Sequence, residues 1–302
     1  MRGLAQAPAC RRTPAEASSE ETKRQGGASP SVRPTQKAAL HTLMTVSTDF
    51  VGKIVLVTGG TKGVGLGIAR VFLCAGATVL VCARNAPVTL PEANGNQARF
   101  IQTDLTDADQ IGALIDGIAA THGKLDVLVN NAGGTPFALT AHSSPRLIEK
   151  LIRLNLTSPL WVAQKANAVM QAQESGGVIV FIASVSALRP SPGSMPYGAA
   201  KAGVLSAVTS LAVEWAPKVR VVAVTPGMVR TEQSHLHYGD EAGIAAVAAT
   251  VPAGRLAEPE DIGQACAFLA SPAASYATGT NLVLHGGGEV PAFLAAANTA
   301  RS

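Results

Sequence analysis

The sequence predicts an α/β fold in which helices cover both faces of a parallel β-sheet. From Lys53 onward, short β-branched runs alternate with longer stretches of helical spacing. The runs are apolar almost throughout, which is typical of parallel strands buried on both faces. Parallel neighbours need crossover connections, and the helical stretches supply them. Because the composition does not change after residue 44, we expect one domain over residues 44–302.

The predicted elements follow one another in a regular order. A first strand leads through a glycine-rich turn into a helix that includes residues 68–73, and a further helix is expected over residues 241–250. A third strand is expected directly before Asp104. The other strand runs are residues 54–57, 78–81, 127–129, 178–182, 219–224 and 281–284.

Residues 1–43 differ from the rest of the chain. They contain no Phe, Trp or Tyr and have no sustained apolar period, so we expect a disordered tail. Seven basic and three acidic side chains in this segment account for the whole net charge of +4, and the other 259 residues hold 17 of each sign. The balanced domain gives no reason to expect a nucleic-acid partner.

Several explanations of the tail remain open. Translation could start at Met44, where the composition changes, or the segment could be dispensable. A transit peptide and a nucleic-acid arm are weaker alternatives, and the acidic residues count against the former. The tail lacks the apolar core of a secretory signal, so we expect a cytoplasmic protein. No apolar run approaches the roughly 18 residues of a membrane span, so no membrane partner is expected.

The turn after the first strand reads Thr58-Gly59-Gly60-Thr61-Lys62-Gly63-Val64-Gly65. Glycines allow a tight strand-to-helix turn and a close backbone approach to a pyrophosphate at the helix N-terminus. The spacing is neither G-x-G-x-x-G nor a P-loop. By itself the turn is therefore equally typical of an ordinary strand–helix loop.

Three side chains have the chemistry of proton transfer to a carbonyl. Tyr197 and Lys201 are four residues apart in a small-residue stretch that we expect to be helical, which places them on one face. A free phenol has a pKa of about 10, and a neighbouring ammonium favours its ionised form, so we expect Lys201 to lower the pKa of Tyr197. Ser184 follows the strand at 178–182 and can donate to an oxygen on which negative charge develops. Ser186 is the nearby alternative.

These motifs occur together in one order. They are Thr58-Gly59-x3-Gly63-x-Gly65, Asp104, Asn130-Asn131-Ala132-Gly133, Asn155, Ser184, Tyr197-x3-Lys201 and Pro226-Gly227. Over residues 49–288 the chain resembles the short-chain dehydrogenase/reductase family in its single-domain form. The resemblance implies a Rossmann-like, doubly wound sheet of about seven strands in the order 3-2-1-4-5-6-7, and a homotetramer or dimer. It also favours Ser184 over Ser186, because the family spaces its Ser and Tyr thirteen residues apart, and it implies that Asn155 supports a proton-relay water.

The end of the second strand bears on cofactor choice. Folds that bind NAD usually place an acid there, but Ala83 occupies the position and Arg84 follows. A guanidinium can bind a 2′-phosphate that a carboxylate would repel. By resemblance, Lys62 matches a second basic position of NADP-preferring relatives. We therefore expect NADP(H), with NAD(H) as the alternative.

The resemblance implies further cofactor contacts along the chain. Asp104 and Leu105 would border the adenine, and the segment from Pro226 would hold the carboxamide. The full predicted set is Gly59, Thr61, Lys62, Gly63, Val64, Gly65, Arg84, Asp104, Leu105, Asn131, Ala132, Gly133, Asn155, Tyr197, Lys201, Pro226, Gly227, Val229 and Thr231.

Three histidines outside this set occur near segments that the resemblance assigns to the site or its surroundings. His235 and His237 suggest a metal site or a substrate loop, and without a clear third ligand we expect the loop and no metal. His285 replaces the Asp common in the family; an altered interface is one interpretation, and we expect a tolerated surface substitution instead.

The sequence thus predicts an NADP(H)-dependent oxidoreductase acting on a small ketone or alcohol. Ser184, Tyr197, Lys201 and Asn155 are its expected catalytic residues. The alternative is a non-catalytic regulator or scaffold that binds a dinucleotide on the same fold. Such a protein would be expected to have lost Tyr, Lys or Ser.

Overall fold

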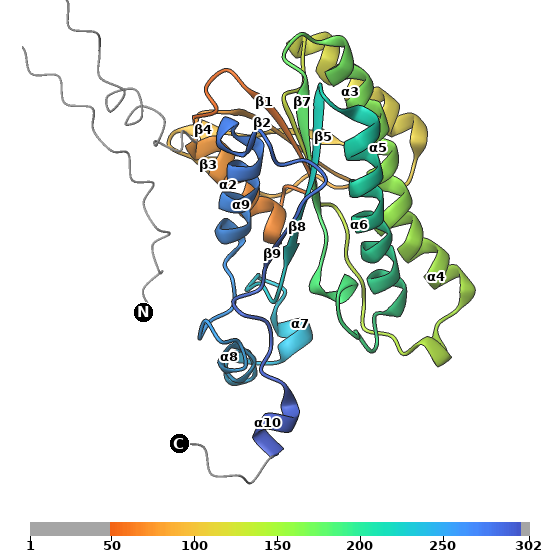
Figure 1. Cartoon of the computed structure of the whole chain (residues 1–302), viewed down its shortest axis with the longest axis vertical. Coiled ribbons are helices and arrows are strands. Elements are labelled where there is room, and N and C mark those ends of the chain that lie inside the picture. Colours follow the sequence, from red (N-terminus) through yellow and green to blue (C-terminus); the bar gives the residue numbers. More distant parts are fainter. Residues whose placement is uncertain (1–48, 297–302) are drawn as a thin grey trace, which may run out of the picture. The chain divides into compact units, whose positions relative to one another are not determined.

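The computed structural model describes residues 49–296 and has seven parallel strands at its centre (Figure 1). These strands are β1 (Ile54–Thr58), β2 (Thr78–Ala83), β5 (Arg99–Gln102), β6 (Val127–Asn130), β7 (Gly177–Ile182), β8 (Val219–Pro226) and β9 (Asn281–Leu284). Their order across the sheet is β5-β2-β1-β6-β7-β8-β9. The predicted order 3-2-1-4-5-6-7 is confirmed, as is the parallel pairing.

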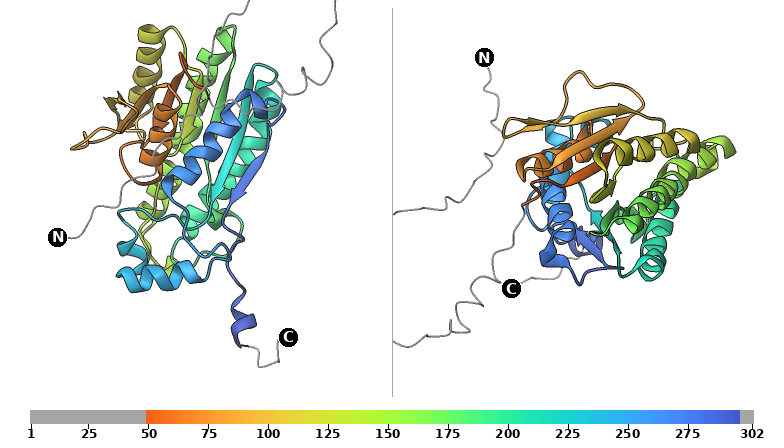
Figure 2. Two further views of the ribbon diagram at one scale, coloured as in Figure 1. Left: turned by 90° about the vertical axis from the view of Figure 1, so that its left-hand side faces the viewer. Right: turned by 90° about the horizontal axis from the view of Figure 1, so that it is seen from above.

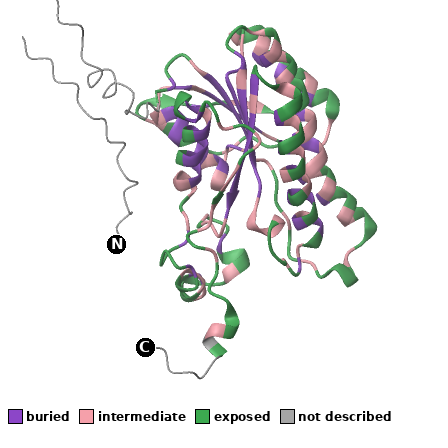
Figure 3. Ribbon diagram, viewed as in Figure 1, coloured by how far each residue is buried: buried purple, intermediate pink, exposed green. Residues whose placement is uncertain are grey.

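Helices cover the two faces of the sheet in separate layers, as three directions of view show (Figures 1 and 2). On one face lie α2 (Gly63–Cys74) and α9 (Pro259–Ala270), and on the other lie α3 (Ala108–His122), α5 (Ser158–Ala172) and α6 (Met195–Trp215). Successive residues of β1 point to opposite faces, so Val55 and Val57 pack on α2 while Ile54 and Leu56 pack on the other layer. The five inner strands are buried along most of their length (Figure 3), which explains their continuous apolar sequence, whereas the edge strands β5 and β9 are partly exposed.

Helix α2 begins at Gly63, five residues before the stretch recognisable in the sequence. Glycine is a poor helix former, so the pattern conceals this first turn. Glycine is also required one turn further on, because a Cβ at Gly67 would lie 2.4 Å from Cβ of Pro259 in α9. The glycine-rich segment is therefore both the strand–helix turn and the contact surface of α2 with α9.

A small hairpin was absent from the predicted elements. Strands β3 (Glu92–Ala93) and β4 (Asn96–Gln97) are antiparallel, and Asn94 and Gly95 form their turn with φ of 51° and 75°. Asn-Gly is typical of such a turn, but strands of two residues leave no alternating pattern to find.

The remaining helices lie near the carboxyl ends of the strands or follow them. They are α4 (Pro145–Ile152), α7 (His235–Tyr238), α8 (Glu241–Ala249) and α10 (Ala292–Ala296). Helix α8 agrees with the helix expected over residues 241–250. Within residues 49–296, no helix has the length and apolar character needed to cross a bilayer. The predicted tail and the alternative start at Met44 lie outside the described residues.

Candidate active site

The turn between β1 and α2 is packed so closely that parts of it admit only glycine. A Cβ on Gly65 would lie 2.3 Å from the carbonyl oxygen of Gly59 and 2.5 Å from Nδ2 of Asn131. Gly59 and Gly63 have φ of 63° and 53°, a region that favours glycine. At Gly63 the surroundings are open, since the nearest atom to an added Cβ is 3.7 Å away. The turn thus presents bare backbone at the N-terminus of a twelve-residue helix.

Thr58, the last residue of β1, ties this turn to the end of β6. Its buried Oγ1 accepts hydrogen bonds of 3.0 Å from the backbone N–H groups of Asn131 and Ala132. Asn131 Nδ2 donates back to the Thr58 carbonyl oxygen at 2.9 Å. Thr58 lay outside the predicted site, although a buried threonine ending an apolar strand is a signal that could have found it.

Asn155 lies in a π-helical turn, Arg153–Thr157, between α4 and α5. Such turns are frequent at functional sites because they displace a side chain from the regular helix surface. Asn155 is fully buried, and its Oδ1 accepts a hydrogen bond of 2.9 Å from Gly134 N–H. Its Nδ2 donates to the carbonyl oxygens of Gly134 and Leu151 at 3.0 Å each. Asn155 therefore holds the chain after β6 in place.

Lys201 comes from α6 and reaches the end of β7. Its Nζ donates to the carbonyl oxygen of Ile182 at 2.8 Å, and only 3% of the residue is exposed. Burial lowers the pKa of Lys201 to about 8. A Cβ on Gly133 would lie 3.5 Å from this Nζ and 2.6 Å from Oδ1 of Asn155. Lys201, Gly133 and Asn155 are thus adjacent.

Tyr197 lies one helical turn before Lys201, whose Nζ is 5.6 Å from the centroid of the tyrosine ring. Burial raises the pKa of Tyr197 above its usual value, and a hydrogen bond with the Ser184 side chain opposes the shift. The direction is opposite to the expected lowering by Lys201, because desolvation of the phenolate is the largest effect. The phenol is therefore held in its protonated form.

The two candidate serines have different partners. Ser184 Oγ accepts a hydrogen bond of 3.1 Å from Ser186 N–H and bonds with Tyr197. Ser186 Oγ instead lies 3.1 Å from Oγ of Ser191. Ser184 is thus the serine beside the tyrosine.

The cations expected to select NADP both lie near the carboxyl ends of the first two strands. Arg84 is exposed directly after β2, and Lys62 is exposed directly before α2. Asp104 Oδ1 accepts hydrogen bonds from Thr106 N–H at 2.9 Å and Thr106 Oγ1 at 2.8 Å, which lower the pKa of Asp104, and Arg84 adds to the lowering. Leu105 points into the core beside α3, so its backbone is the part available to a ligand.

The segment after β8 crosses the start of α2. Gly227 N–H donates to the Leu284 carbonyl oxygen at 2.9 Å, and Val229 forms a parallel bridge with Ala257. Thr231 N–H donates to Ser234 Oγ at 2.9 Å, and Cγ2 of Thr231 is 3.7 Å from the position of a Cβ on Gly63. Two parts of the predicted cofactor site, the glycine turn and the segment after β8, therefore lie together at the N-terminus of α2.

The expected substrate loop contains the short helix α7. Ser234 starts it, with its N–H donating to the carbonyl oxygen of Thr231 at 3.0 Å. His235 Nδ1 lies 3.0 Å from the Glu232 carbonyl oxygen. Nowhere in residues 49–296 do three His, Cys, Asp or Glu side chains gather as a metal would need.

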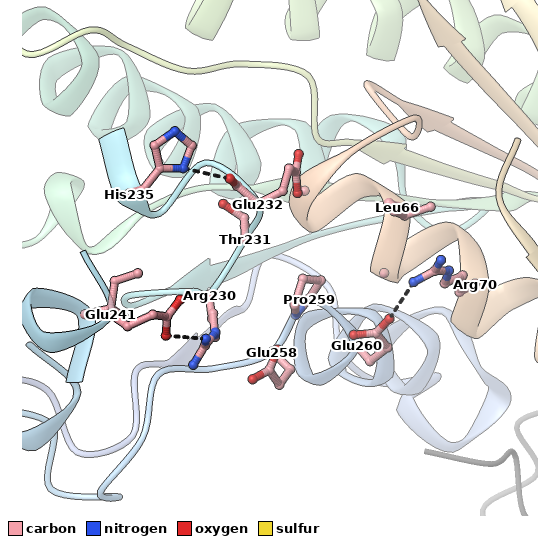
Figure 4. Close-up of a pocket in the computed structure, with 13 residues that line it drawn as sticks. Leu66, Arg70, Arg230, Thr231, Glu232, His235, Glu241, Glu258, Pro259 and Glu260 are labelled. Atoms are coloured by element: carbon pink, nitrogen blue, oxygen red, sulfur yellow. Dashed lines mark hydrogen bonds and ion pairs between the residues drawn. The ribbon is translucent and has the colours of Figure 1, made fainter. Parts of the chain in front are cut away.

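A cavity of about 460 Å³ lies beside the start of α2 (Figure 4). Among the predicted cofactor residues only Gly63 and Thr231 line it, and none of the predicted catalytic residues does. Ion pairs cross its wall, Arg230 with Glu241 at 2.8 Å and Arg70 with Glu260 at 3.7 Å. The cavity therefore borders the start of α2 and does not contain the predicted catalytic residues.

His285 is half-buried in the structure, and its expected role as a surface substitution stays a prediction. A Cβ on Gly227 would lie 2.8 Å from Cβ of His285, so the histidine packs directly over the chain after β8. His285 also lines a second cavity, of about 210 Å³. The reason is the parallel register of β8 and β9, which pairs Pro226 with Leu284 and so places the next residues, Gly227 and His285, side by side.

The carboxyl edge of the sheet fits a nicotinamide dinucleotide. It offers a side-chain-free turn at a helix N-terminus, which suits a pyrophosphate. Beside it stand a buried lysine and a tyrosine bonded to a serine. Ligands of open α/β sheets bind at this edge, where the strand order reverses. The fold and site thus define a dinucleotide-binding α/β oxidoreductase.

Comparison with known proteins gives the family. Residues 59–289 match a family model described as enoyl-(acyl carrier protein) reductase. The chain is 36% identical over 239 residues to 3-oxoacyl-[acyl-carrier-protein] reductase FabG of Vibrio harveyi, which covers 78% of this chain and 97% of that protein. The chain belongs to the short-chain dehydrogenase/reductase family, whose members are oxidoreductases acting on CH–OH or C=O groups with NAD(P).

Two further relatives extend the comparison. The chain is 34% identical to the uncharacterized short-chain type dehydrogenase/reductase y4vI of Sinorhizobium fredii, covering 78% of this chain but 43% of that longer protein. The ligand-free structure of aldohexose dehydrogenase (AldT) from Thermoplasma acidophilum superimposes with a TM-score of 0.73 at 31% identity, covering 80% of this chain and 94% of that one. The chain thus resembles enzymes named for unlike substrates.

Proposed function

We propose that this protein is an NADP(H)-dependent oxidoreductase that reduces a small ketone, or oxidises the matching secondary alcohol. The observation that carries the proposal is the group formed by Ser184, Tyr197 and Lys201 beside the glycine turn. A regulator that only binds a dinucleotide would have no need of a buried lysine beside a tyrosine.

Tyr197 acts as the general acid in ketone reduction. Its raised pKa keeps the phenol protonated at neutral pH, which is the form that can give a proton to a carbonyl oxygen. The Ser184 hydroxyl, which bonds with the phenol, donates to the same oxygen as negative charge develops there. The bound nicotinamide supplies or accepts the hydride.

Lys201 and Asn155 support this transfer. When Tyr197 gives up its proton, the ammonium of Lys201 stabilises the phenolate, which desolvation would otherwise disfavour. Asn155 fixes the chain next to Lys201 through its three hydrogen bonds. Asn155 is therefore a positioning residue in this proposal, in addition to any contact with a relay water.

Two exposed cations bear on which nicotinamide cofactor the protein prefers. Arg84 and Lys62 provide positive charge where an acid would favour NAD, so we infer a preference for NADP(H). We further infer a homotetramer or dimer in the cytoplasm. The substrate is a ketone or alcohol, and the names of the relatives, an acyl-carrier-protein reductase and an aldohexose dehydrogenase, leave its skeleton open.

The decisive experiment replaces the proton donor. Tyr197→Phe should lower kcat for NADPH-dependent ketone reduction by about a thousandfold, within the range typical for loss of a general acid. Steady-state consumption of NADPH over a mixed ketone panel measures the effect.

The matched control is Tyr276→Phe, which removes the same hydroxyl from a fully exposed tyrosine and should leave kcat unchanged. NADPH binding without turnover of any ketone by the wild type would favour the regulator instead.

A further inference from the structure

The second cavity begins one residue beyond Ser184. Its volume is about 210 Å³, and three separate segments contribute to it: the chain after β7, the chain after β8 and the chain after β9. Its lining residues are Val185, Leu188, Arg189, Gly227, Met228, His285, Gly288 and Glu289. Because the cavity adjoins the serine that would hold the reacting oxygen, it is placed to take the remainder of a substrate.

Most of this lining is apolar, and one ion pair interrupts it. Arg189 and Glu289 are 100 residues apart in the sequence, yet Arg189 Nη2 donates to Oε1 of Glu289. Arg189 Nη1 donates to the Pro190 carbonyl oxygen at 3.1 Å. The two side chains are 39% and 33% exposed, so the pair is partly in solvent. Glu289 thus cancels the charge of Arg189 at the edge of an apolar space.

The position of Glu289 is fixed by the segment that carries it. Gly286 accepts a hydrogen bond of 2.9 Å from Ala253 N–H, and Val290 N–H donates to the carbonyl oxygen of Thr250 at 3.3 Å. These bonds hold the segment against the end of α8. Tyr238 of α7 lies close to both charges, since Arg189 lowers and Glu289 raises its pKa, while burial raises that pKa most. The pair therefore lies between α7 and the segment after β9.

We propose that Glu289 and Arg189 set the charge of the accepted substrate: while paired, they restrict the second cavity to uncharged, apolar ketones. A substrate carboxylate at this place would have to displace Glu289 from the guanidinium, or bring a second negative charge to one cation. Without Glu289, Arg189 becomes an anion-binding residue beside the reacting group. This inference rests on the proposed function and adds the substrate class to it.

The test compares two ketones that differ only at the far end, 2-octanone and 7-oxooctanoate. The Glu289→Gln variant should raise kcat/KM for 7-oxooctanoate about tenfold relative to 2-octanone, which corresponds to about 1.4 kcal/mol, because the freed Arg189 can donate to the substrate carboxylate. The gain should appear as a lower KM for 7-oxooctanoate, with kcat unchanged. The double variant Arg189→Gln/Glu289→Gln should lose it.

The matched control is Glu241→Gln, which removes one negative charge from the exposed pair with Arg230 on the other cavity. That variant should leave the ratio of kcat/KM for 7-oxooctanoate to kcat/KM for 2-octanone unchanged. An unchanged ratio in Glu289→Gln, or an equal change in Glu241→Gln, would overturn the inference while leaving ketone reduction intact.

Calorimetric titration separates this inference from failure of the proposed function. Glu289→Gln saturated with NADP⁺, which cannot reduce the ketone, should bind 7-oxooctanoate about tenfold more tightly than the wild type does. Equal affinities would overturn the inference even if neither ketone is turned over. Absence of turnover alone would count against the proposed function only.

Discussion

Arg84 shows how much can depend on one exposed side chain. It follows β2 directly and lies close enough to Asp104 to help lower the pKa of that carboxyl. The residue before it, Ala83, leaves no acid to bond a ribose 2′-OH. Cofactor preference in the proposed enzyme therefore follows from charge at this position.

Replacing Arg84 with Asp should reverse that preference. The variant loses a donor for the 2′-phosphate and gains a carboxylate that repels it, so the ratio of kcat/KM for NADPH to that for NADH should fall about a hundredfold. Steady-state kinetics with both cofactors measure the ratio.

Arg99→Asp makes the same charge change at the opposite end of the neighbouring strand β5, and it should leave the ratio unaltered. A preference unmoved by Arg84→Asp would remove Arg84 from the cofactor site.

Helix α6 contains two of the proposed catalytic residues, Tyr197 and Lys201. It presents Tyr197 and Lys201 on one face and packs against β8 and the end of β7, so the lysine is carried into the core with the helix. The pKa of Lys201, lowered to about 8, means that burial disfavours its charged form. The helix thus keeps a destabilising residue at a position where the proposed reaction requires it.

Lys201→Met should therefore separate stability from activity. Methionine has a similar length and no charge, so the free energy of unfolding at pH 7 should rise by about 1–2 kcal/mol, after the loss of the bond to Ile182 is subtracted. Activity should fall at least a hundredfold. Urea unfolding and NADPH consumption give the two readouts.

The stability difference should also depend on pH. Between about pH 8 and 10.5 the unfolded wild type binds a proton at Lys201 that the folded protein has released, so wild-type stability rises with pH and the difference shrinks. Lys165→Met, in the exposed part of α5, should change neither readout. A variant less stable than wild type at pH 7 would contradict the assigned burial cost.

At the scale of the whole molecule, charge separates two parts of the chain. The net charge of +4 resides in residues 1–43, whereas the remaining 259 residues are balanced. The seven-stranded sheet and every predicted site residue lie within residues 49–296. We therefore treat residues 44–302 as the catalytic domain in the proposed function.

A chain that starts at Met44 should keep its fold and its activity. Its Tm should stay within about 2 °C of the full-length value, and kcat should be unchanged, while retention on a cation-exchange resin falls. Scanning calorimetry, kinetics and light scattering compare the two chains, with a tetramer or dimer expected for both. A large fall in Tm or a change of assembly would assign residues 1–43 a structural role.

Local patterns in the sequence predicted the parallel sheet, and the family resemblance supplied its strand order. Apolar strand runs and glycine at a tight turn indicated the elements, and the spacing of Tyr197 and Lys201 predicted that they share one helix face. The start of α2 and the β3–β4 hairpin escaped, because glycine hides a helical turn and a two-residue strand carries no period. The contact of His285 with Gly227 escaped because it depends on the register between β8 and β9.

Only the tertiary structure decided the electrostatics. Whether Tyr197 has a raised or lowered pKa depends on burial, which is set by everything packed around the phenol and not by the neighbour at i+4. The hydrogen bond between Gly134 and Asn155 joins residues 21 positions apart, and the ion pair of Arg189 with Glu289 joins residues 100 positions apart. Contacts over such separations leave no period in the sequence, so they become visible only when the sheet and its loops have been assembled.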